Sequence, residues 1–353
     1  MKRGASDDSE DDESRKPKRR KRAPAKEQRV DLSEFGGDVK TLKDIVRLAK
    51  FLAEHKQSRR KLKTGVMRLA ECVTELEEFD QMIGLEELKD DVARQIMFVT
   101  LGLNDKEMMH TVLTGPPGMG KTTSIEKMAA IYAKLGFLSI GHVVSATRAD
   151  MIDQYLGGTA IKTAMVLEAS RGGVLLLDEA YSLGDSTGRD SFSKECINTI
   201  NQFLSENPKD FMCIIAGYEA ELRRNFFGSN PGLERRFQWW FRLKPYKLND
   251  LVDIFLHQIK TQEWTLAEDI STEWVGTLLS DGGENAFKNN GGDTLILFDK
   301  CKVCHSHRVF LLDPSERKVL TRADLKRGLE LFKTYKNKHS KGALTETMRH
   351  MYS

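Results

Sequence analysis

A glycine-rich stretch over residues 115–122 constrains the fold of this chain more than any other feature. It reads Gly115-Pro116-Pro117-Gly118-Met119-Gly120-Lys121-Thr122 and matches the pattern G-x-x-x-x-G-K-[ST] at every fixed position. The apolar residues 111–114 before it predict a buried strand, and residues 123–130 after it predict a helix. A strand, a glycine turn and a helix N-terminus form a phosphate-binding site, because backbone N–H groups and the helix dipole converge on an anion.

The same pattern predicts a role for each polar residue of the loop. We expect Lys121 to reach the β- and γ-phosphates of a nucleotide and Thr122 to bind Mg²⁺. Thr123, at the start of the predicted helix, belongs to the same nucleotide-binding set. The predicted cofactors are therefore ATP and Mg²⁺.

A second acidic segment completes the predicted nucleotide site. Residues 173–180 form a short apolar run that ends in Asp178 and Glu179, which is typical of a strand buried in a parallel sheet. We expect Asp178 to hold the Mg²⁺ shell and Glu179 to polarise the water that attacks the γ-phosphate. Taken alone, the run could equally be a strand that ends in a solvated acidic turn. Next to a complete phosphate loop, the nucleotide interpretation is favoured.

Composition narrows the class of protein. The 353 residues are enough for two domains, and 40% of them are apolar while 30% are charged. No apolar run approaches the ~20 residues that a membrane span needs, so we expect no membrane partner. The five cysteines are odd in number and scattered, which favours a reduced compartment over a disulfide framework. A net charge of +3 is too small to predict nucleic-acid binding by itself.

The chain divides into four predicted regions. Residues 1–30 form an acidic and then basic tail that is too polar to bury a core, so disorder is predicted. The basic run 16–22 resembles a nuclear import signal and predicts the nucleus of a eukaryotic or virus-infected cell. The alternatives are a polyelectrolyte tail and a cytoplasmic protein.

Residues 31–78 are predicted to form a helical pair. Apolar residues recur at helical spacing in both halves: Leu42, Ile45, Val46, Ala49 and Leu52, then Leu62, Val66, Leu69, Val73 and Leu76. The cationic cluster 56–63 lies between them. A solvated helix face is favoured over a nucleic-acid patch for this cluster.

Residues 79–245 alternate between strand and helix patterns. Strands are expected near 110–114, 137–145, 173–178, 212–216 and 238–243, and helices near 86–98, 121–134, 160–170 and 191–206. This alternation predicts an α/β core with a parallel sheet covered by helices. Residues 246–353 lose the strand pattern and predict a helical C-terminal region, with a basic, frayed tail from Tyr335.

Four stretches give the chain a family resemblance. They are residues 79–89 (FDQMIGLEELK), residues 148–163 (RADMIDQYLGGTAIKT), residues 173–183 (GVLLLDEAYSL), and residues 214–218 with 229–233 (IIAGY and SNPGL). In this order they resemble the AAA+ ATPases, within them the group of CbbX and stage V sporulation protein K, whose best-known members are red-type Rubisco activases. The resemblance is dense over 79–245, weak over the lid and absent over 1–78.

The resemblance implies a homo-oligomeric ring, expected to be a hexamer, with nucleotide bound at the subunit interface between the sheet domain and a helical lid. It implies that Arg236, with Arg235 as the second choice, acts as an arginine finger on the neighbouring subunit's γ-phosphate. It also implies a nucleotide sensor at Tyr218, where many AAA+ proteins have Asn or Thr. A nuclear-import-like tail does not support Rubisco activation as the function.

The lid departs from the family pattern. Where the family has a sensor arginine within G-N-A-R, this chain has Gly291-Gly292-Asp293-Thr294. Thr294 therefore replaces the arginine. Either Lys300, Lys302 or Arg308 on the following helix substitutes for it, or lid sensing is absent.

Tyr155-Leu156-Gly157 resembles the first pore loop of AAA+ proteins that thread polypeptides. An aromatic tip grips an extended chain by apolar contact, whereas nucleic-acid translocators rely on cationic loops. Two alternatives remain open: single-stranded nucleic acid stacking on Tyr155, and a plain helix end closed by Gly157 and Gly158.

We therefore predict an ATP-hydrolysing ring ATPase that remodels or threads a macromolecule, with protein favoured. A DNA- or RNA-associated motor and a nucleotide-dependent scaffold are the alternatives. Cys301-Lys302-Val303-Cys304-His305 matches the haem-attachment pattern C-x-x-C-H, but nothing else in the chain supports export or a haem pocket.

Overall fold

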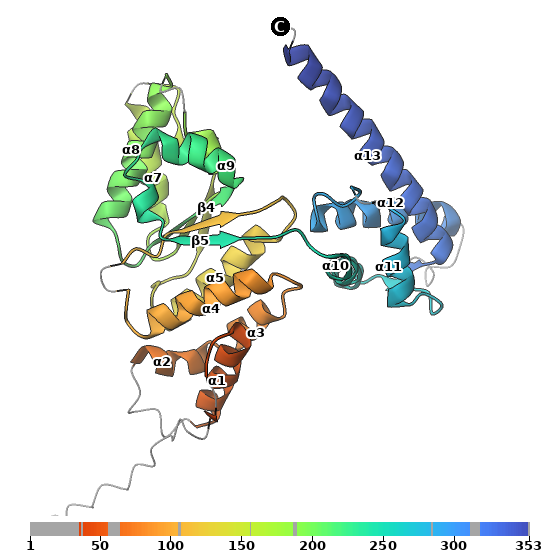
Figure 1. Cartoon of the computed structure of the whole chain (residues 1–353), viewed down its shortest axis with the longest axis horizontal. Helices are drawn as coiled ribbons and strands as arrows, with labels where there is room; N and C mark the ends of the chain where they lie inside the picture. The colour runs from red at the N-terminus through yellow and green to blue at the C-terminus, as the bar shows by residue number, and fades with distance from the viewer. Residues whose placement is uncertain are drawn as a thin grey trace, which may run out of the picture.

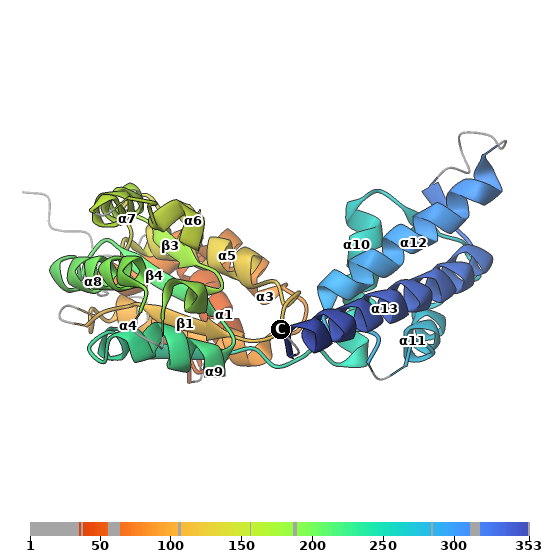
Figure 2. The ribbon, with the colours of Figure 1, turned by 90° about the horizontal axis from the view of Figure 1, so that it is seen from above.

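The computed structural model describes residues 35–36, 38–55, 64–104, 107–155, 157–185, 189–283, 285–310 and 318–351. Its elements form two lobes joined by the segment after the last strand of the main sheet (Figure 1). Seen from above, the lid lobe lies beside the sheet lobe and does not cover it (Figure 2). The basic run 16–22, the cationic cluster 56–63 and Leu156 lie outside the described residues.

A five-stranded sheet forms the centre of the first lobe. Its strands are β1 (Thr111–Thr114), β2 (Val143–Ala146), β3 (Val174–Leu177), β4 (Met212–Gly217) and β5 (Trp239–Arg242), in the order β2-β3-β4-β1-β5. All pairs are parallel, which confirms the predicted α/β class. Only β2 departs clearly from expectation: residues 137–141 form a loop tied to Gly172, so the strand begins later than predicted.

Helices cover both faces of the sheet because side chains alternate along each strand. Leu113 and Ile214 pack with α4 (Glu86–Thr100) and α5 (Lys121–Leu135). Their chain neighbours Val112 and Ile215 point to the opposite face and pack in the other core, together with α7 (Gly158–Ala169) and α8 (Ser191–Glu206). The four predicted helices are therefore present, with two on each face.

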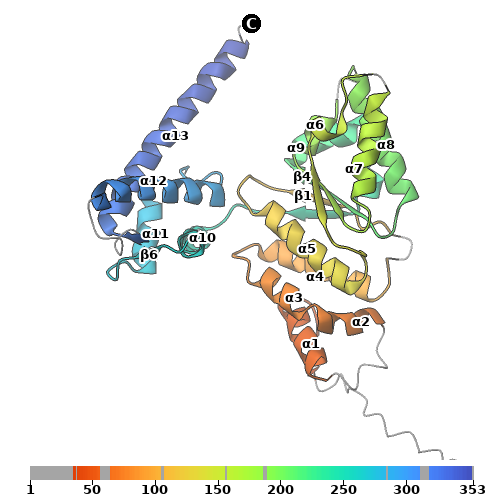
Figure 3. The ribbon, with the colours of Figure 1, turned by 180° about the vertical axis from the view of Figure 1, so that it is seen from behind.

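The N-terminal helices pack on the outside of α4 and α5 (Figure 3). They are α1 (Leu42–Glu54), α2 (Thr64–Arg68), η3 (Leu69–Glu71) and α3 (Val73–Asp80). The second predicted helix is thus wrong as one element, because a 3-10 turn at 69–71 breaks it. The turn redirects the chain so that Leu69, Cys72 and Leu76 are all buried. These residues share one core with the sheet, so we propose that the N-terminal helices and the sheet form one folding unit.

The lid lobe has its own apolar core and four main helices: α10 (Leu248–Thr261), α11 (Thr272–Ser280), α12 (Gly291–Val309) and α13 (Arg322–Met351). Two short parallel strands, β6 (Thr265–Leu266) and β7 (Val319–Leu320), clasp it at one side. The predicted frayed tail from Tyr335 is wrong, since α13 continues as a helix to Met351. An ion pair of 2.8 Å between Lys336 and buried Asp293 on α12 ties this part of α13 to the lid.

Short segments connect the remaining parts: α6 (Arg148–Met151), α9 (Glu219–Glu221), η4 (Ala180–Leu183), η5 (Leu222–Phe226), η6 (Phe227–Ser229) and η7 (Glu234–Arg236). Within the ranges given above, no helix is both long and apolar enough to cross a bilayer.

Candidate nucleotide site

Parallel strands bring the predicted site residues to one edge of the sheet. Because β1 lies between β4 and β5 and β3 flanks β4, the carboxyl ends of β1, β3 and β4 are neighbours. The phosphate loop follows β1, the acidic pair follows β3, and Tyr218 follows β4. Ligands of open α/β sheets bind at this kind of edge.

A cleft of about 300 Å³ opens at this edge. It is lined by most of the predicted set, namely Gly115, Pro117, Gly118, Met119, Gly120, Lys121, Thr122, Thr123, Asp178, Glu179 and Tyr218, and also by Tyr181 and Gly217. Pro116 lies in the same loop, and its carbonyl accepts a hydrogen bond from Lys121. The structure therefore brings the two halves of the predicted nucleotide site together.

The loop has the backbone that a phosphate cradle needs. Gly118 and Gly120 adopt φ of 72° and 74°, in the left-handed region that favours glycine. The helix α5 begins directly after them, at Lys121, so its N-terminus faces the cleft. Free N–H groups and the positive end of a 15-residue helix favour an anion here.

The side chain of Lys121 is held by backbone carbonyls of the phosphate loop. Its Nζ donates to the carbonyls of Gly115 and Pro116 at 3.1 and 3.3 Å. Burial lowers the pKa of Lys121, and the nearby Asp178 and Glu179 carboxylates oppose this shift. A cation is therefore held between the loop and the acidic pair, where an incoming phosphate would meet it.

The acidic pair leaves the sheet through a left-handed turn. Glu179 has φ 51° and ψ 40°, an uncommon conformation for a residue other than glycine, and its N–H donates to Asp178 Oδ1 at 3.0 Å. Both carboxylates are exposed in the cleft, directly after the fully buried strand β3. A strained residue at a strand end is characteristic of functional sites.

The oxygen donors suit Mg²⁺. Thr122 and Asp178 both line the cleft with exposed side chains, and Mg²⁺ prefers one or two protein oxygens completed by phosphate and water. Among the described residues no group of three His, Cys, Asp or Glu side chains could hold a metal on its own.

Tyr181 is a site residue that sequence reasoning did not assign. It lies on η4, two residues after Glu179, and its ring packs 3.1 Å from the point where a Cβ on Gly217 would lie. Burial raises the pKa of Tyr181, and the nearby Glu179 and Glu221 carboxylates add to the shift. Its proximity to Glu179 in the chain was the available signal.

Tyr218, the predicted sensor, lies at the end of β4 with 48% of its surface exposed. It lines the same cleft as Lys121 and Glu179. Its hydroxyl can donate a hydrogen bond. Contact with the nucleotide remains a prediction for this residue.

The two predicted arginine fingers lie outside the cleft of their own chain. Arg236 on η7 donates to Ser205 Oγ at 2.6 and 2.9 Å and to the Gly232 carbonyl at 2.6 Å. Arg235 beside it is exposed and makes no ion pair with any described residue. Either guanidinium could act only on a second subunit, and Arg236 would first have to leave its partners.

The predicted pore loop lies between α6 and α7, away from the cleft. Tyr155 is 77% exposed, and Gly157 adopts φ 82° just before α7 begins at Gly158. The alternative of a helix end closed by Gly157 and Gly158 is wrong, because a helix begins here.

The lid residues proposed as substitutes for the sensor arginine all face other lid groups. Lys300 lies 4.9 Å from the Tyr335 ring, Lys302 pairs with Asp299 at 2.7 Å, and Arg308 pairs with Asp324 at 3.0 Å. Thr294 is fully buried and donates to Gln258 Oε1 and to the Gly291 carbonyl, both at 3.0 Å. None of these four lines the cleft.

A second cavity, of about 730 Å³, continues the cleft towards the lid. The two spaces share Gly118, Gly120 and Thr123 as lining residues. Ile83 and Met82 line the second cavity from the sheet lobe, and the lid contributes Ile254, His257, Gln258 and Leu295. The first space suits the phosphates and the second, with its apolar lining, suits the base of a nucleotide.

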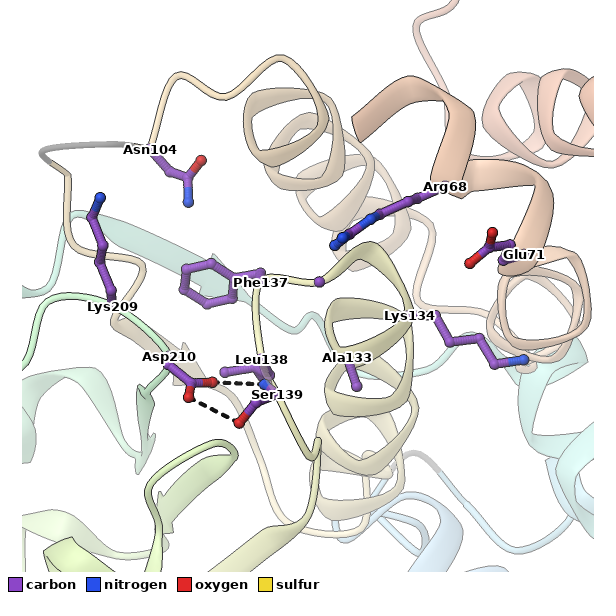
Figure 4. Close-up of a pocket in the computed structure, with 11 residues that line it drawn as sticks. Arg68, Glu71, Asn104, Ala133, Lys134, Phe137, Leu138, Ser139, Lys209 and Asp210 are labelled. Carbon is purple, nitrogen blue, oxygen red and sulfur yellow. Dashed lines mark hydrogen bonds between the residues drawn. The ribbon is translucent and has the colours of Figure 1, made fainter. Parts of the chain in front are cut away.

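A third cavity, of about 700 Å³, lies at the opposite end of α5 (Figure 4). Three of its charged groups are engaged: Arg68 Nη1 donates to the Leu135 carbonyl at 2.8 Å, Lys134 pairs with Glu75 at 2.7 Å, and Asp210 accepts from Ser139. Arg68 occupies the space beside Gly136. This cavity is a joint between the N-terminal helices and the core.

The C-x-x-C-H motif lies inside the lid. Cys301 and Cys304 are buried, and burial raises the pKa of both thiols. His305 bonds to Asp324 at 3.3 Å, and Asp324 also caps α13 through Thr321. The motif therefore builds the lid core.

Comparisons with known proteins agree with this geometry. Residues 111–227 match the family described as ATPase family associated with various cellular activities (AAA). The chain is 36% identical to a cfxQ-like protein of Acanthamoeba polyphaga mimivirus over 75% of this chain and 66% of that protein, so it spans about two thirds of this relative's length. It is 31% identical to the chloroplastic ribulose bisphosphate carboxylase/oxygenase activase of Cyanidioschyzon merolae, over 69% of this chain and 85% of that protein.

Among solved structures, the fold is similar to the FIGL-1 AAA domain in complex with ADP. The TM-score is 0.53 with 16% identity, over 72% of this chain and 84% of that one. The chain belongs to the AAA+ ATPases, a family of ATP-hydrolysing P-loop enzymes, within the group of CbbX and CfxQ-like proteins.

Proposed function

We propose that this chain assembles into a ring, expected to be a hexamer, and uses ATP hydrolysis to remodel protein by drawing it past Tyr155. The observation that carries the proposal is the 77% exposed Tyr155 on a loop that lies outside the nucleotide cleft. A large aromatic side chain in water, held by a structured loop, is suited to contact another molecule.

The hydrolytic step follows from the cleft. Lys121 and the loop N–H groups hold the phosphates, and Thr122 with Asp178 would hold Mg²⁺, which neutralises charge on the β- and γ-phosphates. Glu179 orients water for in-line attack on the γ-phosphorus and accepts its proton. Tyr181 lines the cleft together with Glu179 and would help to set the direction of that carboxylate.

The ring completes the site. Because Arg236 and Arg235 lie outside their own cleft, a finger must come from the neighbouring subunit. Arg236 occupies the family position and is the first choice; exposed Arg235 is the second. An arginine finger supplied in trans is worth about 10³–10⁵ in rate where it is known.

The local charge around Tyr155 favours a protein substrate over nucleic acid. Asp153 lies in the same loop and its Oδ1 accepts from the N–H groups of Gln154 and Tyr155 at 2.6 and 3.1 Å. Lys162, on the helix that follows this loop, donates to the carbonyls of Ala149 and Ile152. A carboxylate at the tip and an engaged lysine suit a peptide better than a phosphate backbone.

The relatives also favour a protein substrate, because the Cyanidioschyzon merolae relative is an activase of a carboxylase, which is itself a protein. Two other functions remain as alternatives: a DNA- or RNA-associated motor, and a scaffold that binds nucleotide with little hydrolysis. The basic run 16–22 motivates a nuclear site of action, with the cytoplasm as the alternative.

One assay separates the three functions. We would measure ATP turnover of the full chain alone, with single-stranded DNA, and with a permanently unfolded protein. The proposal expects basal turnover and stimulation by the unfolded protein only. Stimulation by DNA alone would support the motor, and ATP binding without turnover under all conditions would support the scaffold.

A further inference from the structure

Three consecutive carbonyls of the phosphate loop accept hydrogen bonds from the lid side of the chain. The bonds are Asn290 Nδ2 to Pro117 O at 3.2 Å, Gly291 N to Gly118 O at 3.0 Å, and Tyr246 Oη to Met119 O at 3.1 Å. A phosphate loop binds its ligand through N–H groups. Its carbonyls on the other side of the peptide plane are therefore the groups through which another part of the protein could sense the loop.

Asn290 is the centre of this contact. Only 2% of its surface is exposed, and while its amide donates to Pro117, its Oδ1 accepts from Tyr246 N at 3.1 Å. Tyr246 lies in the segment that links the last strand to the lid helix α10. One side chain thus joins the phosphate loop, the linking segment and the lid.

The backbone of Asn290 is strained. Its φ of 51° with ψ of −123° is a conformation that glycine adopts far more readily than asparagine. A residue other than glycine persists in such a conformation only where the surrounding structure holds it there. Glycine would fit this backbone but would lack the side chain that bonds to Pro117 and Tyr246.

Lid residues brace the turn from behind. Gln258 Nε2 and Thr294 Oγ1 both donate to the Gly291 carbonyl, at 2.9 and 3.0 Å, while Gly291 N reaches the loop. Thr294 therefore supports the turn from the position where the family has its sensor arginine. Packing is close: a Cβ on Gly118 would lie 1.8 Å from the Asn289 carbonyl oxygen. A displacement of the loop must move the turn as well, because packed interiors transmit strain.

We propose that Asn290 and Tyr246 are positioning residues that lock the phosphate loop to the lid, so that nucleotide in the loop orders the lid without a sensor arginine. The proposal rests on nucleotide binding at the loop, as in the proposed function, and is independent of what the ring threads. In this chain the carbonyls of the phosphate loop would couple nucleotide binding to the lid, which Thr294 cannot do in place of the arginine.

The test uses Asn290→Gly in the full chain. Glycine keeps the turn and relieves its strain, so the variant should melt at or above the wild-type temperature. Hydrogen exchange would be followed with and without ADP at residues 115–122 and at residues 291–300. In the wild type ADP should protect both segments.

In Asn290→Gly the loop should keep its protection, while ADP-induced protection of the lid segment falls about fivefold, the equilibrium effect of one net hydrogen bond. The KM for ATP should rise by a similar factor. Tyr246→Phe removes only the hydroxyl that reaches Met119 and should give the same pattern. Gln262→Ala serves as the control, because this lid amide bonds to Lys302 at 3.0 Å and has no bond to the loop.

Undiminished lid protection in both Asn290→Gly and Tyr246→Phe would overturn the proposal. So would an equal loss in Gln262→Ala, because the effect would then belong to the lid in general. If ADP failed to protect residues 115–122 of the wild type, the nucleotide site itself would be wrong and the inference would fall with it. That result is distinguishable from loss of coupling alone.

Discussion

At the scale of single residues, we expect the chemistry to depend on one carboxylate that the backbone turns into the cleft. Glu179 comes shortly after four buried strand residues and adopts the left-handed conformation, and Tyr181 lines the same cleft. We propose that this placement holds the carboxylate near the γ-phosphate of a bound nucleotide. Positioned general bases contribute about 10²–10⁴ in rate.

Glu179→Gln should therefore bind ATP and hydrolyse it about 10²–10⁴-fold more slowly, since glutamine keeps the shape and removes the base. Nucleotide binding by calorimetry and turnover of ATP are the two measurements. Glu206→Gln, at the end of α8, is the matched control, because its carboxylate bonds only to Gln202 in the described structure. Normal turnover in Glu179→Gln would show that another group activates the water.

The sequence predicts a site residue when a short motif around that residue indicates its role. The phosphate loop, Asp178 and Glu179 carry their own local signals, so their convergence follows once a parallel sheet is predicted. Tyr246 and Asn290 could not be found in this way. They meet Met119 and Pro117 only after the lid has folded back, across separations of 127 and 173 residues.

At the scale of elements, periodicity predicts the helices and their buried faces better than their ends. The five apolar residues of α1 are buried as predicted, and a Thr41–Asp44 capping box starts the helix. The second N-terminal helix breaks because Arg68 is drawn to the C-terminus of α5, a tertiary contact that no local pattern contains. The helix α13 continues past Tyr335 because Lys336 pairs with α12.

The lid element gives a prediction of its own. Thr294→Arg would restore the family residue in the sequence but place a guanidinium where the native side chain is fully buried. We expect loss of the Gln258 and Gly291 bonds, a destabilised lid and a melting temperature lower by several degrees, since burying an unpaired charge is costly. Thermal melts and the KM for ATP would be measured. A stable variant with tighter ATP binding would show that the arginine position still faces the nucleotide.

At the scale of the whole molecule, the phosphate loop and the acidic pair line one cleft, and Arg235 and Arg236 do not line it. This division predicts complementation between two inactive variants. Arg236→Ala keeps an intact cleft, and Lys121→Ala keeps an intact finger. Mixed rings regain some complete interfaces, so the mixture should exceed the activity of either variant alone.

Two further variants refine the same experiment. Ser205→Ala removes the hydroxyl that holds Arg236 and leaves the guanidinium. This variant should therefore be active alone, without being mixed with a second variant. Arg235→Ala mixed with Lys121→Ala tests the second candidate. If subunits exchange and neither mixture gains activity, the site is not shared between subunits.

Tyr155→Ala tests whether the chain acts on protein through the exposed side chain of Tyr155. The variant would be compared with Tyr155→Phe, which keeps the aromatic ring, for thermal stability, basal ATP turnover and unfolding of a tagged protein. Because the side chain is 77% exposed and outside the cleft, melting temperature should be unchanged and basal turnover should stay within about a few-fold. Substrate stimulation and unfolding should be lost in Tyr155→Ala and kept in Tyr155→Phe. Undiminished unfolding by Tyr155→Ala, or a lower melting temperature with a proportionate loss of every activity, would contradict the account.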